Sequence, residues 1–145
     1  MSTIEVTVSG IILNQNDEIL LCKSHKWDNK YIIPGGHVEY GEKMENALRR
    51  ELKEETDLDI YSIKLAGVKE YFEDNSYYKK RHFIFFDYIC RTDNTEVVLN
   101  DEAQSFTWTK YEDVNHDLLG GDVSNLLRRV FENSVENKVE IFYNY

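Results

Sequence analysis

The chain has 145 residues, of which 41% are apolar, and 27 acidic against 17 basic side chains give it a formal net charge of -10. This length and composition fit one folded domain, residues 1–145, and exclude a disordered chain. The negative charge disfavours binding to a nucleic-acid polymer, whereas a small phosphorylated ligand stays compatible if basic side chains or metal ions supply local positive charge. Because no apolar run has membrane-spanning length and the first residues lack a signal-peptide pattern, we expect a cytoplasmic protein without a membrane partner.

The first elements in the chain favour strands. Residues 3–13 alternate well enough for a strand, residues 14–17 ("NQND") form a turn signal, and residues 18–23 ("EILLCK") continue as a second strand. The two strands are therefore expected to pair as a hairpin. Residues 31–36 ("YIIPGG") read as a short extended stretch, since Pro34 restricts the residue before it and two glycines then free the backbone.

The remainder of the chain combines two helices with further strands. The sequence predicts a helix from about residue 43 to residue 56, strands at 60–72, 81–91, 96–99 and 105–108, and a C-terminal helix at 122–138. The strand at 81–91 is apolar on both faces, so we place it in the centre of a sheet. The pattern predicts an α+β fold with a mixed sheet between helices.

The two cysteines lie in apolar runs. Cys22 is in "ILLCK" and Cys90 is in "FDYICR". We interpret both as buried free thiols of a reducing compartment, with reactivity or metal binding as the alternative. Two isolated cysteines do not make a zinc cluster.

The first helix places acidic residues where apolar ones are expected. On a helical wheel, Glu51 and Glu55 fall inside the apolar arc and Glu54 lies at its edge; the arc itself is formed by Met44, Ala47, Leu48 and Leu52. These carboxylates are neighbours that repel one another, and Arg50 alone cannot neutralise them. The pattern is typical either of a solvated acidic face or of a site for a hard divalent cation such as Mg²⁺ or Mn²⁺.

The residues around this helix resemble a known motif. From Gly36 the sequence "GHVEYGEKMENALRRELKEETDL", residues 36–58, is similar to the Nudix box, G-x5-E-x7-R-E-U-x-E-E-x-G-U, in which U is a bulky aliphatic residue. "PGG" stands just before it, as is usual in that family. The matching positions are Gly36, Glu42, Arg50, Glu51, Leu52, Glu54, Glu55 and Leu58.

One position departs from the motif. The second glycine of the box is Asp57 in this chain. A residue just past a helix end often takes the left-handed conformation, which Asp tolerates better than most other residues. We therefore expect a small cost in stability and an intact metal site.

The resemblance extends to the order of the elements and implies a Nudix-type α/β/α sandwich around a mixed β-sheet. It implies a Mg²⁺- or Mn²⁺-dependent hydrolase that cleaves a phosphoanhydride bond in a nucleoside diphosphate-linked compound. By the same resemblance, Glu51, Glu54 and Glu55 bind metal, the carbonyl of Gly35 is a further ligand, and Arg50 holds the acidic cluster. Glu42 matches an acid whose role is structural rather than catalytic.

A further acidic residue is left with two interpretations. Glu102 in "NDEAQSFTW" resembles a glutamate that serves some family members as metal ligand or general base. It is equally compatible with a plain loop acid. We carry it as a candidate catalytic residue and metal ligand.

Candidate substrate-binding residues are Lys23, Tyr31 and His37. Lys23 either binds a phosphate or base or is a solubilising strand end, and Tyr31, like Trp27, either stacks on a base or packs. His37 directly follows the glycines and so can approach the phosphates. Residues 79–81 ("KKR") are the most basic spot of the chain and are either a solvated turn or an aid to substrate capture.

Several functions remain open. The first hypothesis is hydrolysis of a nucleoside triphosphate to the monophosphate and pyrophosphate, in the manner of the mutator-type branch; ADP-ribose or nucleotide-sugar hydrolysis and a non-hydrolytic nucleotide sensor are the alternatives. The intact box carboxylates favour a hydrolase. The aromatic tail, residues 141–145, is either an extra strand, a core plug or the contact of a homodimer.

Overall fold

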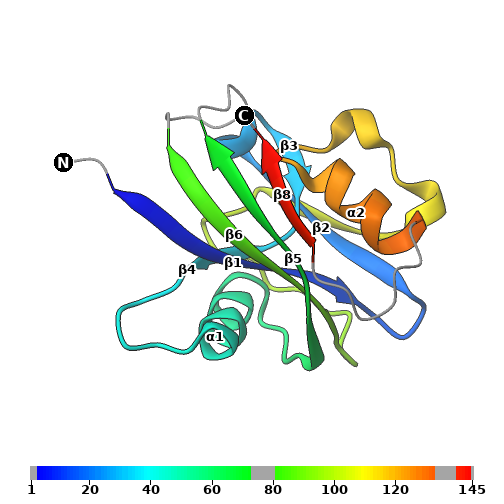
Figure 1. Cartoon of the computed structure of the whole chain (residues 1–145). Coiled ribbons are helices and arrows are strands. Elements are labelled where there is room, and N and C mark those ends of the chain that lie inside the picture. Colours follow the sequence, from blue (N-terminus) through cyan, green and yellow to red (C-terminus); the bar gives the residue numbers. More distant parts are fainter. Residues whose placement is uncertain (1–2, 73–80, 133–139, 145) are drawn as a thin grey trace.

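The computed structural model describes residues 3–72, 81–132 and 140–144, with side chains described up to residue 132. The described helices and strands, in Figure 1, are β1 (Ile4–Leu13), β2 (Glu18–Ser24), β3 (Lys30–Ile32), β4 (Gly35–His37), α1 (Met44–Thr56), β5 (Tyr61–Phe72), β6 (His82–Arg91), β7 (Ser105–Lys110), α2 (Val123–Glu132) and β8 (Glu140–Asn144). Three short 3₁₀ turns, η1 (His25–Trp27), η2 (Tyr111–Asp113) and η3 (His116–Leu118), lie in the connections.

The strands form one mixed sheet. Its order is β3-β2-β1-β6-β5-β8, with β4 paired to β1 and β7 paired to β2. The pairs β1–β6 and β5–β8 are parallel, and the other strand pairs of this sheet are antiparallel. Pairing of Leu13 with Ile19 confirms the predicted hairpin. The position of β6 between β1 and β5 confirms its predicted central place.

The two helices cover opposite faces of the sheet (Figure 1). Because side chains alternate along a strand, β1 serves both layers. Val8 and Ile12 pack in the cluster that contains the apolar residues of α1, whereas Ile11 and Leu13 pack in the cluster that contains those of α2. This arrangement confirms the predicted α+β fold, an α/β/α sandwich. None of the helices formed by the described residues has the length and apolar character of a membrane span.

The prediction of a strand at residues 96–99 is wrong. This segment is a connection that crosses the α1 side of the sheet. Val97 and Leu99 pack against the core there while Val98 is exposed, and the Val98 N–H donates to the carbonyl of Thr56 at 3.0 Å. The alternating pattern therefore reflects a segment that packs on the core. Its backbone hydrogen-bonds to the C-terminal end of α1 instead of to another strand.

Three other elements differ from the prediction only in their limits. The stretch "YIIPGG" is divided between β3, which pairs with β2, and β4, which pairs with β1. Helix α2 ends at Glu132, and the rest of the predicted helix, residues 133–138, lies outside the described residues. The backbone of β8 pairs in parallel with β5, which supports the extra-strand interpretation of the tail.

The end of α1 has the predicted left-handed conformation. Asp57 has φ 61° and ψ 22°, and its N–H donates to the carbonyl of Lys53 at 3.0 Å. The Lys53 ammonium also lies 3.4 Å from the Asp57 carboxylate, an exposed pair of small energetic value. A non-glycine residue thus ends the helix as the family's glycine would.

Replacing Asp57 by Gly is expected to raise the free energy of unfolding by about 0.5–1 kcal/mol, because glycine adopts positive φ without the steric cost of a Cβ. Asp57→Ala is expected to lower it by a similar amount. Urea unfolding of the three proteins measures both changes. Lower stability of the Gly variant would mean that the Lys53–Asp57 contact outweighs the backbone cost.

Both cysteines are buried free thiols, as predicted. Burial raises the pKa of Cys22 and of Cys90 to about 12. Thiols with such pKa values are almost entirely protonated near neutral pH and are therefore poor nucleophiles. We assign both residues to core packing.

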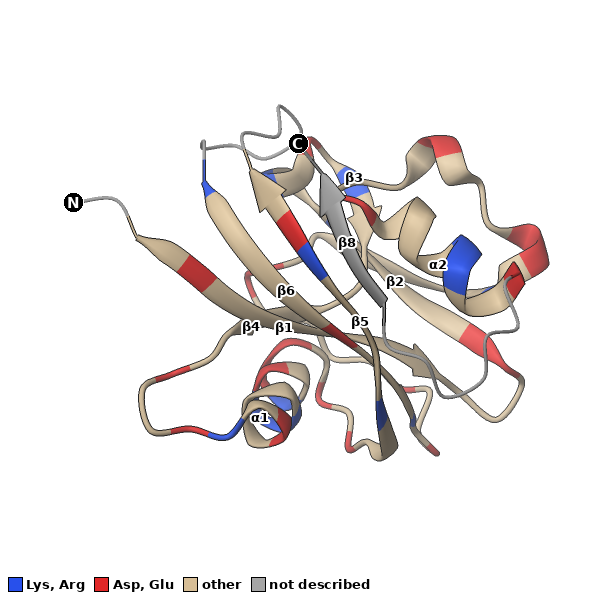
Figure 2. Cartoon of the chain, in the orientation of Figure 1, with Lys and Arg blue, Asp and Glu red and all other residues tan. Residues whose placement is uncertain are grey.

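The charged residues are distributed over the whole molecule. Figure 2 shows acidic residues on the strands, on α1 and on the connections near α2, and it shows no long basic stretch among the described residues. Helix α1 itself carries both acidic and basic residues (Figure 2). The local pairing between them decides the electrostatics of the site.

Candidate active site

The site is built where α1 faces the glycine backbone of β4. The N–H of Gly35 donates to Oε2 of Glu55 at 3.0 Å. A Cβ at Gly36 would overlap the carboxylate of Glu51. Gly36 therefore lets the Glu51 carboxylate approach the main chain, whereas a Cβ at Gly35 would overlap β1 at Val8 and Ser9.

Arg50 ties the acidic residues together. Its Nε and Nη2 donate to the two carboxylate oxygens of Glu42 at 2.8 and 3.0 Å, and its Nη1 donates to Glu51 at 2.8 Å and to Glu54 at 3.4 Å. Nη2 also donates to the carbonyl of His37 at 3.0 Å. The hydrogen bond from Arg50 lowers the pKa of Glu42. One guanidinium thus fixes α1 to the loop that precedes it.

Glu55 is the most strongly perturbed carboxylate on α1. It is 9% exposed, and its burial, with a smaller contribution from the charge of Glu51, raises its pKa to about 8. Burial also raises the pKa of Glu51, although Arg50 opposes this shift. Glu54 is exposed. A carboxyl group with a pKa near neutral pH, next to other carboxylates, is typical of functional sites.

The raised pKa of Glu55 predicts how stability depends on pH. Between its ordinary pKa of 4.5 and about 8, the folded chain retains a proton that the unfolded chain has released. The contribution of Glu55 to the stability of the metal-free protein therefore decreases as the pH rises through this range. In Glu55→Gln this loss is absent, so the variant is expected to gain stability relative to the unmodified protein from about pH 5 to about pH 8.

Denaturant unfolding of both proteins in a chelator, at a series of pH values, measures that difference. We expect it to increase with pH by at most about 1.4 kcal/mol per unit and to level off above pH 8. A difference that is independent of pH would mean that Glu55 titrates like an exposed carboxyl group.

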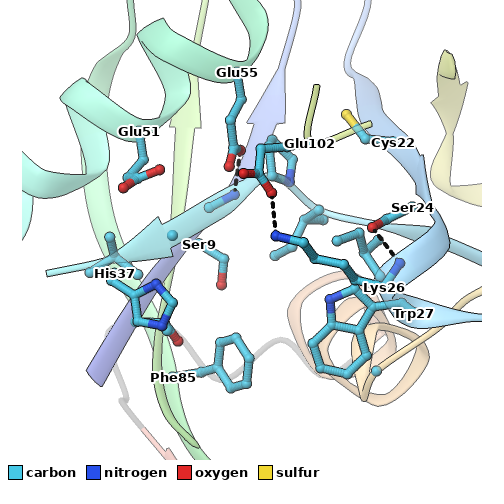
Figure 3. A pocket seen from close by; sticks show the side chains of 18 of the residues that line it. Ser9, Cys22, Ser24, Lys26, Trp27, His37, Glu51, Glu55, Phe85 and Glu102 are labelled. Carbon is cyan, nitrogen blue, oxygen red and sulfur yellow. Dashed lines mark hydrogen bonds and ion pairs between the residues drawn. The ribbon is translucent and has the colours of Figure 1, made fainter. Parts of the chain in front are cut away.

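Glu51, Glu54 and Glu55 line a cavity of about 400 Å³. Figure 3 shows Glu51 and Glu55 projecting from α1 into this cavity, with Glu102 close to them and the rings of Trp27 and Phe85 at the other end. Glu102 comes from the loop before β7, which the pairing of β7 with β2 brings to the site. Its Oε2 lies 2.8 Å from Nζ of Lys26. Arg50 and Glu54 line the same cavity.

The predicted substrate-binding residues are placed differently from one another. His37 lines the cavity, and its Nε2 lies 2.7 Å from Oε1 of Glu5. Lys23 and Tyr31 pair across β2 and β3 and do not belong to the lining. Cys22 and Ser24 do line the cavity, and strand alternation turns the residue between them to the other face. The arrangement therefore does not support a substrate contact for Lys23 or Tyr31.

Lys26 is a basic residue of the cavity lining that the sequence does not single out. It follows β2 in the turn η1, where its N–H donates to the hydroxyl of Ser24 at 3.3 Å. The serine at the start of this turn is a cap signal that predicts where the strand ends.

In the predicted basic loop, Arg81 pairs with Glu5 at 2.8 Å, and Lys79 and Lys80 lie outside the described residues.

The oxygen donors of the site suit a hard divalent cation. Carboxylates of Glu51, Glu54, Glu55 and Glu102 and the Gly35 carbonyl are the kind of ligand that Mg²⁺ and Mn²⁺ take. Burial and, to a smaller extent, the charge of Glu51 raise the pKa of Glu55, and a bound cation would offset the cost of ionising this carboxyl group. Within residues 3–72 and 81–132, no three His, Cys, Asp or Glu side chains are already arranged as a group that could hold a metal ion. Metal binding here therefore stays a prediction, with the donor chemistry in its favour.

A family model described as the NUDIX domain matches residues 3–130. The chain belongs to the Nudix family. It is 33% identical, over 117 residues, to the nucleoside triphosphatase NudI of Escherichia coli (strain K12), a match that covers 72% of this chain and 82% of that protein. This result confirms the resemblance seen in the sequence and identifies the chain as a Nudix pyrophosphohydrolase, which acts on phosphorus-containing anhydrides.

Solved structures confirm the Nudix fold. A NUDIX hydrolase from Nitrosomonas europaea superposes with a TM-score of 0.78 at 17% identity, covering 99% of this chain and 81% of the other. The NUDIX domain of Shewanella oneidensis NrtR, solved in complex with ADP ribose, gives 0.74 at 17% identity and covers 91% and 89%. At these identities the likeness concerns the fold alone.

Proposed function

We propose that this Nudix hydrolase cleaves a nucleoside triphosphate to the monophosphate and pyrophosphate with the help of Mg²⁺ or Mn²⁺. The observation that carries the proposal is the single cavity with carboxylates at one end and aromatic rings at the other, because a nucleotide has charged phosphates and a flat base at its own two ends. The similarity to a nucleoside triphosphatase supports the triphosphate as substrate. In the reaction, water adds to one phosphorus and one anhydride bond breaks.

The proposed roles follow the positions of the side chains. Glu51, Glu54, Glu55, Glu102 and the Gly35 carbonyl would hold the cation, and such a cation would supply positive charge to neutralise the pyrophosphate group and to make a water molecule more acidic. Arg50 keeps Glu51 and Glu54 in place through its hydrogen bonds. His37 lines the cavity and would contact the phosphates.

Glu55 is the first candidate for the general base. It lines the cavity, and the hydrogen bond that its Oε2 accepts from Gly35 would orient the deprotonated carboxylate to take a proton from a water molecule. Glu102 is the second candidate, because it lies on the same cavity and is bound by Lys26. The substitutions described in the Discussion separate the two.

A second substrate class has support of its own. The structural neighbour from Shewanella oneidensis binds ADP ribose. ADP-ribose and nucleotide sugars also join a base to a pyrophosphate and therefore suit a cavity of this shape. A domain that binds a nucleotide without cleaving it is the third possibility, and the intact carboxylates of the box favour a hydrolase over it.

A product assay with Mg²⁺ tests the proposal. Nucleoside triphosphates, ADP-ribose and nucleotide sugars are incubated separately, with and without a chelator, and the products are separated by chromatography. We expect monophosphate and pyrophosphate from a triphosphate only when the metal is present. Cleavage of ADP-ribose alone would transfer the proposal to the second class, and tight binding without any cleavage would make the protein a sensor.

The setting of the reaction follows from the same proposal. A cytoplasmic location, where nucleotides and Mg²⁺ occur together, suits this activity, and the partner is a small nucleotide. A homodimer through the C-terminal strand stays a prediction, because the side chains of residues 133–145 lie outside the described part of the chain.

A further inference from the structure

A polar floor runs through the cavity from the glycine stretch of β4 to the end that is remote from the carboxylates, beside an aromatic wall. Ser9 and Thr7 line the part of this floor next to β4, Lys69 lines its remote end, and strand register explains the arrangement. Thr7 pairs with Phe85, and Phe85 pairs with Lys69, so the side chains of Thr7, Phe85 and Lys69 lie in one row across β1, β6 and β5. They face the cavity from the same side of the sheet.

Lys69 is held by a buried ion pair. Its Nζ lies 3.6 Å from Oδ2 of Asp87, and Oδ1 of Asp87 accepts a hydrogen bond from the hydroxyl of Ser9 at 2.6 Å. Lys69 is 6% exposed and Asp87 is 1% exposed. The ammonium also lies 5.1 Å from the centre of the Phe85 ring. A buried ion pair rarely stabilises a fold more than apolar residues would, so its presence on a cavity wall points to a ligand.

The hydroxyl of Thr7 gives an independent indication. Thr7 is 4% exposed, and its Oγ1 has no hydrogen-bond partner among the described residues. Leaving a buried hydroxyl unpaired is unfavourable. Because Thr7 lines the cavity, a bound ligand can supply the missing partner.

Aromatic side chains form the wall around these polar groups. We name them the aromatic cluster: Trp27, Tyr71, Phe83 and Phe85. Phe83 and Phe85 lie 5.3 Å apart between ring centres, and Trp27 lies 6.3 Å from Phe85. Such a wall accepts a flat ring and leaves the polar floor to contact the ring edge.

The distance between the two ends suits a nucleotide. His37 pairs with Thr7, so Lys69 lies three strands away from the β4 glycine stretch. Three strand spacings amount to about 14 Å. If the phosphates lie at the carboxylates, the edge of the base that is remote from the sugar reaches Lys69, and the nucleotide passes over Thr7, which lies one strand from β4.

We propose that Lys69, fixed by Asp87, binds the remote edge of the nucleobase and selects keto bases (uracil, thymine, guanine) over amino bases (cytosine, adenine), and that Thr7, nearer the phosphates, contacts the same bound nucleotide. The proposal rests on the proposed function and adds the substrate class. An ammonium has only donors to offer, so it pairs with a carbonyl oxygen and opposes an amino group. The Thr7 hydroxyl can donate or accept, so it contributes to affinity for either kind of base.

Competing rates measure the selectivity. We expect kcat/KM for UTP and GTP to exceed that for CTP and ATP by about 10- to 100-fold, the value of one hydrogen bond to a charged group. In Lys69→Met/Asp87→Asn, which removes both charges and so leaves no unpaired buried ion, this ratio is expected to fall close to one.

Thr7→Val tests the second contact without disturbing the ion pair. We expect about tenfold lower kcat/KM for every triphosphate and an unchanged or higher melting temperature, because the lost hydroxyl has no partner among the described residues. Thr7→Ser keeps the hydroxyl and is the matched control. A lower melting temperature with unchanged kcat/KM would assign Thr7 to packing and overturn its role.

Binding of the monophosphates keeps the two proposals apart, since it requires no hydrolysis. Calorimetry with UMP and CMP is expected to show about tenfold or more tighter binding of UMP. Preference for UMP without triphosphate cleavage would refute the proposed reaction and support the base site. Equal kcat/KM for the triphosphates with equal binding of UMP and CMP would refute the base site and leave the hydrolase intact.

Discussion

Glu55→Gln is expected to lower kcat/KM by about a thousandfold or more without destabilising the metal-free protein. The carboxylate projects into the cavity beside Glu51, where its burial raises its pKa to about 8. Losing a general base lowers a rate by about 10²- to 10⁴-fold, and losing a metal ligand adds to this. An amide of the same shape keeps the core filled and removes the buried charge.

The experiment pairs steady-state kinetics with thermal unfolding in a chelator near pH 8. Glu45→Gln, the same substitution at an exposed position of α1, is the matched control and should retain both activity and stability. Glu102→Gln separates the two candidate bases, since a larger loss there than at Glu55 would transfer that role. Full activity of Glu55→Gln would contradict the assignment of the site.

Arg50→Lys is expected to cost about 2 kcal/mol of stability and about a hundredfold in kcat/KM. The guanidinium contacts both oxygens of Glu42 and also Glu51, whereas a lysine ammonium cannot make a bidentate contact. Hydrogen bonds to charged groups contribute about 1.5–3 kcal/mol each, and partial exposure of Arg50 reduces the loss. Residues that orient metal ligands typically change activity by about 10- to 100-fold.

Arg49→Lys provides the comparison for this prediction. Arg49 is the neighbouring arginine of α1, and its Nη1 donates to the carbonyl of Ile60 at 2.6 Å, away from the acidic residues. The Arg49→Lys variant should lose about 1 kcal/mol of its free energy of unfolding and keep its activity. Circular dichroism at the assay temperature shows whether each variant is folded. A folded Arg50→Lys protein with normal kcat/KM would mean that the carboxylates are positioned without the arginine.

Local features of the sequence predicted the acidic part of the site. Glu51, Glu54 and Glu55 are neighbours on any helix because of the 3.6-residue period, and α1 places them together as expected. Asp57 ends that helix because Asp tolerates positive φ. Each of these inferences depends on residues that are close in the chain.

Errors and omissions occurred where distant residues meet. Residues 96–99 have the alternation of a strand, but the core and the end of α1 bind them instead of a sheet edge. Lys26 lines the cavity and the candidate Lys23 does not, because the direction of a strand-end side chain depends on where β2 ends and on its register with β3 and β7. Glu102 approaches the site only through that register.

The sequence by itself determined the family, the α+β class and the acidic helix, because helical period, turn residues and box spacing are local properties of the chain. Only the tertiary structure revealed the polar floor of the cavity. Ser9, Lys69 and Asp87 come from three strands far apart in the sequence, and none of them stands in a recognisable pattern. They meet because β6 lies between β1 and β5, and the burial that this sheet order creates gives the ion pair and the Thr7 hydroxyl their chemical meaning.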